Sequence, residues 1–111
     1  LGIQEYDNEL KLRLEYRPDL SWIFYEDNTL PIPLDEWFLI EGYYKISKDE
    51  DGQVIIWQNK TEIFNVSGFP TTLSDFPIYW SVNNYTNKIS PNPCTIYVDD
   101  ILISTSRIEQ P

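Results

Sequence analysis

The side chains best suited to chemistry in this sequence are tyrosines, carboxylates and amides at alternate positions of two β-like segments, 37–46 and 78–85. Because alternate residues of a strand share one face, each series would lie on one side of its strand. Aromatic rings stack on the C–H faces of sugars, while amides and carboxylates bind the hydroxyl groups. The pattern predicts carbohydrate-binding residues on both segments, which would form one face if the two strands lie in one sheet: Glu41, Tyr43, Lys45, Tyr79, Asn83 and Tyr85.

Each series also has an interpretation without a ligand. A solvated outer sheet face with an ion pair between Glu41 and Lys45 would explain the first. Tyr85 is open to three interpretations: a strand-end aromatic, a sugar contact or a proton-transfer group. The chain contains no His, which removes the commonest general base. No catalytic residue is therefore assigned, and Tyr85 remains the weak candidate.

Metal and modification signals are sparse. The acidic runs 49–51 and 99–100 offer the oxygen ligands that Ca²⁺ prefers, but the first fits a hairpin turn and lacks the spacing of an EF-hand loop. We predict no metal and no cofactor. Cys94 has no second cysteine to pair with and is expected to be a buried, small apolar side chain. N-glycosylation sequons, which also arise by chance, begin at Asn59, Asn65 and Asn84.

Composition favours an all-β protein. Aromatic residues make up 15% of the 111 residues, with eight Pro, four Gly and no Met, as in strands separated by many turns. The length predicts a single domain over residues 1–111. The net charge of −10 argues against nucleic acid or an anionic membrane as partner. No apolar run approaches about 18 residues, so no membrane span is predicted.

Alternating hydrophobicity predicts the strands of an antiparallel sandwich. Asp51-Gly52 is expected to close the central hairpin, because both residue types tolerate positive φ. A loop is expected over 65–77. The predicted strands are Glu9–Tyr16, Ser21–Tyr25, Trp37–Ile46, Gln53–Asn59, Lys60–Phe64, Ile78–Tyr85 and Cys94–Thr105. The predicted core is Leu10, Leu12, Leu14, Phe38, Ile40, Ile56, Trp80, Val82 and Val98.

Three motifs occur in a familiar order: Glu36-Trp37 leading to Tyr43-Tyr44-Lys45, then DGQVIIWQN over 51–59, then IYVDDI over 96–101. Together they resemble the C-terminal half of concanavalin A-like jelly rolls, especially polysaccharide lyase-like ones such as heparin lyase I and alginate lyase relatives. The resemblance covers roughly residues 34–104 and implies a secreted or cell-surface protein. Such folds are about twice this length, so it also implies either a missing N-terminal half or a homo-oligomer whose chains complete one another.

The function expected from this resemblance is polysaccharide binding by an extracytoplasmic jelly-roll domain. One alternative is part of a polysaccharide lyase, in which the matching position makes Tyr85 the proton-transfer residue. β-Elimination also needs the uronate carboxylate neutralised, and the resemblance places the helper residues upstream, so the prediction leans away from an enzyme. The other alternative is a structural or adhesive secreted β-sandwich that self-assembles through its sheet edges.

Overall fold

A computed structural model of the chain describes residues 1–17, 21–26, 30–75, 77–85, 88, 90–91 and 94–108. The chain divides into two compact units, Leu1–Asp75 and Phe76–Pro111. None of the described residues is helical. Accordingly, this part of the chain holds no helix long and apolar enough to cross a membrane. The strands are β1 (Gly2–Tyr6), β2 (Glu9–Tyr16), β3 (Ile23–Tyr25), β4 (Ile40–Lys45), β5 (Gly52–Gln58) and β6 (Thr61–Phe69).

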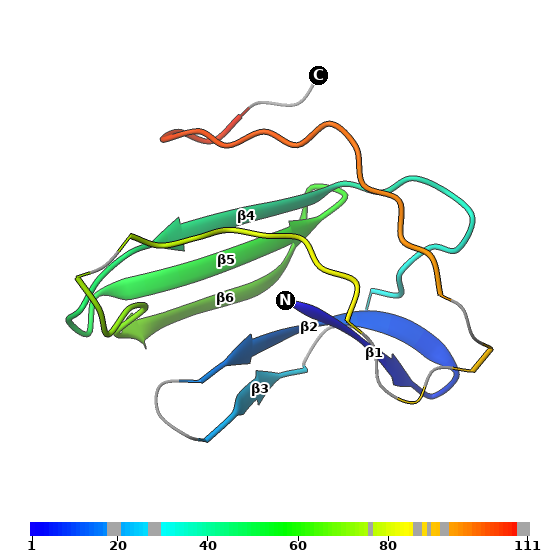
Figure 1. Cartoon of the computed structure of the whole chain (residues 1–111), viewed down its shortest axis with the longest axis horizontal. Coiled ribbons are helices and arrows are strands. Elements are labelled where there is room, and N and C mark those ends of the chain that lie inside the picture. The colour runs from blue at the N-terminus through cyan, green and yellow to red at the C-terminus, as the bar shows by residue number, and fades with distance from the viewer. Residues whose placement is uncertain are drawn as a thin grey trace. The chain divides into compact units, whose positions relative to one another are not determined.

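The six strands form two three-stranded antiparallel sheets, both within the first unit. The first sheet has the order β1-β2-β3 and the second has the order β4-β5-β6, drawn in blue and green in Figure 1. Within each sheet consecutive strands are neighbours, as short hairpin connections dictate. The prediction of an all-β, antiparallel protein is confirmed.

In the first sheet, β2 has the predicted bounds, because its strict alternation of apolar and charged residues leaves one half-buried register. Strand β1 is absent from the prediction. It is joined to β2 by Asp7 and Asn8, whose φ angles of 49° and 63° are those of a two-residue hairpin turn. The turn-forming pair Asp7-Asn8 was the sequence signal from which β1 could have been predicted.

The second sheet corrects one prediction and shortens others. Strand β4 is shorter than 37–46, and β6 extends the predicted short strand 60–64 through residues 65–69, where a loop over 65–77 was expected. Residues 70–75 form no strand, in agreement with the prediction. Asn59 and Lys60, with φ angles of 48° and 70°, form the tight turn that connects β5 to β6. The polar residues of β6 resemble a loop in sequence, but a strand with one solvated face accepts them.

Gly52 is required for a different reason than predicted. Gly52 does not have a positive φ angle. It is the first residue of β5 and is buried at that end of the sheet. A Cβ atom there would lie 2.4 Å from the backbone oxygen of Phe69 and 2.7 Å from the Thr71 side chain. The close approach of the chain after β6 therefore excludes any larger residue.

The hydrophobic core draws on both sheets. Its buried members are Leu12, Leu14, Ile32, Ile56 and Phe64, with the predicted Leu10 and Phe38 packed partly against them. Apolar side chains from β2, β5 and β6 thus remove one another from water, which stabilises the pairing of the two sheets.

Four predicted core residues are exposed instead: Ile40, Trp80, Val82 and Val98, which are 43–62% accessible. The last three lie in the second unit, where residues 77–85 and 94–105 form no strand. The strands predicted over 78–85 and 94–105 are therefore wrong. Alternation alone does not make a strand, because its N–H and C=O groups also need a paired neighbour. Cys94 is likewise exposed, contrary to the prediction that it is buried.

Candidate functional site

The face of the second sheet opposite the core carries polar and aromatic side chains from all three strands. Directly paired residues share a side, so the pairs Glu41–Trp57 and Tyr43–Ile55 project away from buried Ile56. We call this surface the outer face. It comprises Glu41, Tyr43, Lys45, Gln53, Ile55, Trp57, Glu62, Asn65 and Ser67.

Aromatic and polar groups are interleaved on the outer face. Tyr43 is 46% exposed, and Trp57 is half-buried on the neighbouring strand. Beside them the Gln53 amide donates a hydrogen bond to Asn65 Oδ1 at 2.9 Å, and Asn65 Nδ2 donates to Glu62 Oε1 at 3.3 Å. This row of amides and a carboxylate crosses from β5 to β6 and leaves further donors and acceptors directed to solvent.

At the turn end of β4, charges are held in fixed pairs. Lys45 Nζ lies 3.0 Å from Asp51 Oδ2. The Ser47 hydroxyl also donates to Asp51, and this bond together with Lys45 holds the pKa of the Asp51 carboxyl below its usual value. Lys48 pairs with Asp75 in the same region. These exposed ion pairs order the turn but contribute little to the free energy of unfolding.

Thr71 fixes the end of β4 against the chain that follows β6. Its hydroxyl donates to the Lys45 carbonyl at 2.6 Å and accepts from the Ser47 N–H at 2.8 Å. Its own N–H donates to the Ser47 carbonyl at 2.9 Å, and its carbonyl accepts from the Tyr44 hydroxyl. The buried Thr71 side chain therefore fixes the position of Lys45, the last residue of β4, and with it this end of the outer face.

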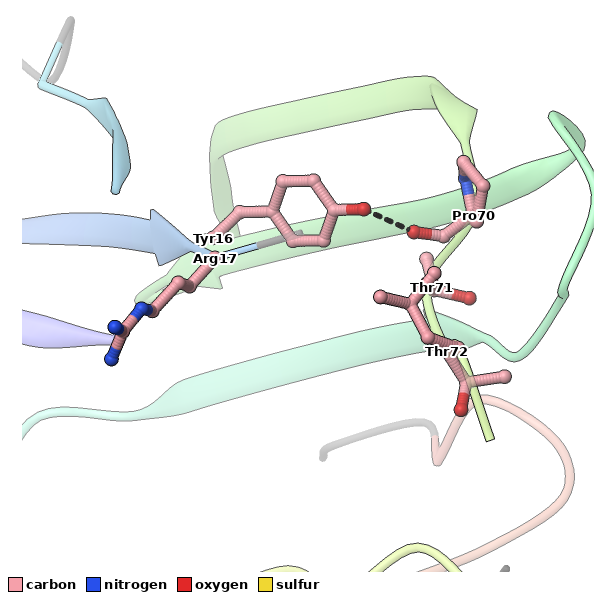
Figure 2. Close-up of a pocket in the computed structure, with 6 residues that line it drawn as sticks. Tyr16, Arg17, Pro70, Thr71 and Thr72 are labelled. Atoms are coloured by element: carbon pink, nitrogen blue, oxygen red, sulfur yellow. Dashed lines mark hydrogen bonds between the residues drawn. The ribbon is translucent and has the colours of Figure 1, made fainter. Parts of the chain in front are cut away.

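A cavity of about 260 Å³ lies beside this anchor, lined by Tyr16, Arg17, Pro70, Thr71, Thr72 and Leu73. In Figure 2 the Tyr16 ring points to Pro70, whose carbonyl accepts its hydroxyl at 2.5 Å, whereas the Arg17 side chain extends away from Pro70. The ring of Tyr16 also packs against Phe69 with 4.7 Å between centroids. These contacts tie β2 to the end of β6, so the cavity borders a structural junction between the sheets.

The exposed face of the first sheet is organised around Arg13. Its guanidinium donates to Glu15 at 2.6 Å and to Gln4 at 3.1 Å, and it lies 4.5 Å from the Phe24 ring centroid. Glu26 lies 3.6 Å from the same guanidinium. Because these partners surround Arg13, its charge is satisfied within the sheet rather than presented to a ligand.

The predicted sugar-binding residues fall into two groups in the structure. Glu41, Tyr43 and Lys45 lie together on one side of β4, as predicted. The others, Tyr79, Asn83 and Tyr85, belong to the second unit, where both tyrosines are about 90% exposed. Their assignment to one shared face with β4 stays a prediction.

Sequence reasoning missed the contributions of β5 and β6 to the outer face, namely Gln53, Trp57, Glu62 and Asn65. The alternation of Gln53, Ile55 and Trp57 was visible, but only the register places it beside Tyr43. Among the described residues, no group of three or more Asp, Glu or Cys side chains gathers into a cation site.

No protein-family model, curated protein or solved structure matches this chain. The resemblance to concanavalin A-like jelly rolls therefore stays a proposal.

Proposed function

We propose that this protein binds polysaccharide non-covalently on the outer face of the second sheet. The observation that carries the proposal is the placement of Tyr43 and Trp57 on one sheet face among Glu41, Gln53 and Asn65. The exposed Tyr43 ring and the half-buried Trp57 ring supply stacking surfaces, and the flanking amides and carboxylates supply partners for sugar hydroxyls.

A sheet face suits an extended chain because its side chains stand in rows. Neighbouring strands lie about 4.8 Å apart, and same-face residues along a strand about 6.6 Å apart, so several adjacent sugar units can be contacted at once. We include in the proposal a secreted or cell-surface protein with a jelly-roll architecture, and a sugar-binding role for Tyr79, Asn83 and Tyr85.

The first test is retention of the wild-type protein on glycan arrays and in affinity gels. Tyr43→Ala and Tyr85→Ala should each weaken binding by about 1–2 kcal/mol, or about 5- to 30-fold, through loss of one aromatic contact. Tyr43→Phe keeps the ring and should bind nearly as wild type. Tyr97→Ala is the matched control, because Tyr97 is 78% exposed but outside the proposed surface. No retention on any polysaccharide would remove the proposal.

Self-assembly is the second candidate, favoured by the apolar side chains exposed in the second unit. Trp80, Ile96 and Val98 are 42–62% exposed, and a large exposed apolar area is typical of surfaces that bind another protein. Sedimentation velocity across a concentration series tests it. A monomer at all concentrations would reject self-assembly, whereas an obligate oligomer without glycan affinity would replace the binding proposal.

The variant Tyr85→Phe distinguishes the lyase alternative from binding without catalysis. This change preserves stacking and so should leave binding intact, but it deletes the only hydroxyl available for proton transfer at that residue. Ultraviolet absorbance of unsaturated products, lost in the variant, would establish catalysis; retention without product in the wild type would favour binding alone.

A further inference from the structure

We infer that the outer face selects neutral polysaccharides over acidic ones, an inference that rests on the proposed binding function and names its ligand class. It departs from the uronate-rich substrates that the lyase-like resemblance would imply. The selectivity follows from the charges of the second sheet and from the interactions that its lysines already make.

The second sheet and its turns carry an excess of carboxylates. Residues 40–69 contain five acidic side chains and three lysines, a formal charge of −2 within a chain of net charge −10. Two of the five carboxylates, Glu41 and Glu62, lie on the outer face itself. A polyanion laid along this face would meet like charge both locally and from the whole molecule.

The lysines of this region are already engaged. Lys45, the only cation on the outer face, pairs with Asp51 at 3.0 Å. Lys48 pairs with Asp75, and Lys60, in the β5–β6 turn, is not free either. Recognition of a uronate carboxylate needs an available Arg or Lys donor, because a desolvated charge without a partner is unfavourable. A ligand carboxylate at Lys45 would have to displace Asp51.

The remaining groups suit hydroxyl-rich, uncharged sugars. Gln53 and Asn65 combine donors and acceptors, and the Glu62 and Glu41 carboxylates accept from sugar hydroxyls. Tyr43 and Trp57 add stacking surface that does not depend on ligand charge. The same carboxylates that repel a polyanion thus bind a neutral chain.

The decisive comparison uses one polymer backbone in two charge states: polygalacturonate and its fully methyl-esterified form, with a neutral β-glucan as a further probe. In affinity gels at about 0.01 M ionic strength, the neutral chains should retard the protein. The polygalacturonate should bind at least about fivefold more weakly for each like charge held at about 4 Å. Raising the ionic strength to about 0.1 M should narrow this difference, because screening shortens the Debye length from about 30 Å to about 10 Å.

Charge-removing variants test the cause. Glu62→Gln and Glu41→Gln should each raise polygalacturonate affinity, and Asp51→Asn should do so by releasing Lys45. Glu9→Gln, which removes an exposed carboxylate from the first sheet, is the control and should raise polygalacturonate affinity less than the variants of the second sheet do.

Preferential binding of polygalacturonate by the wild type would overturn the inference while leaving the binding function intact. Equal affinity for both charge states would also overturn it. Absence of binding to every probe would remove the proposed function and the inference together.

Discussion

Replacing Thr71 by Val tests whether the hydroxyl that anchors β4 stabilises the sheet. The change keeps the shape but deletes the hydrogen bonds to Lys45 O at 2.6 Å and from Ser47 N at 2.8 Å. Each such bond contributes about 0.5–1.5 kcal/mol net, and a buried N–H left without a partner costs about 1–3 kcal/mol. We expect Thr71→Val to lower the free energy of unfolding by about 2–3 kcal/mol.

Urea unfolding followed by tryptophan fluorescence measures this loss, because the chain contains four Trp residues. Thr72→Val is the matched control. The Thr72 hydroxyl makes only exposed contacts of 3.3 Å with the backbone of Ser74, so its removal should cost less than about 0.5 kcal/mol. Similar losses in the two variants, or a loss below about 0.5 kcal/mol for Thr71→Val, would refute the anchoring role.

Three further predictions concern the same unit. Gly52→Ala should destabilise the fold by several kcal/mol in thermal unfolding, because its Cβ would lie 2.4 Å from the Phe69 carbonyl oxygen; a melting temperature within about 2 °C of wild type would contradict this. Tyr16→Phe should cost about 1 kcal/mol in urea unfolding by removing the bond to Pro70, and no cost would mean that the bond contributes nothing to stability. Burial and a neighbouring carboxylate raise the pKa of Tyr6, so the native state holds that proton more tightly than the unfolded state does. Stability should therefore fall as pH rises above about 10, and less steeply in Tyr6→Phe; parallel pH profiles would exclude this residue.

The sequence was most informative where local pattern and tertiary role agree. Strand β2 was predicted at its observed bounds because Leu12 and Leu14 alternate with charged residues, which permits one register only. The central hairpin of β4 and β5 followed from its β-branched and aromatic content. Strand β6 was underestimated because Asn65 and Ser67 resemble loop residues when their sheet neighbours are unknown.

The candidate site was predictable in part. Alternation placed Glu41, Tyr43 and Lys45 on one side of their strand, and the structure agrees. The pairing of Trp57 with Glu41 depends on hydrogen bonds between strands, and no periodicity within one strand specifies which residue lies opposite. The residues that β5 and β6 contribute to the outer face therefore could not be predicted from the sequence pattern.

By itself the sequence determined an all-β antiparallel chain, because two-residue alternation, β-branched content and turn residues are local properties. The tertiary structure decided which alternating segments became strands: β4, β5 and β6 pair, whereas residues 78–85 with the same alternation do not. It also decided why Gly52 is a glycine, through the approach of Phe69. The physical reason is common to both. Pairing and close packing join residues distant in sequence, and their energies depend on neighbours that local pattern does not identify.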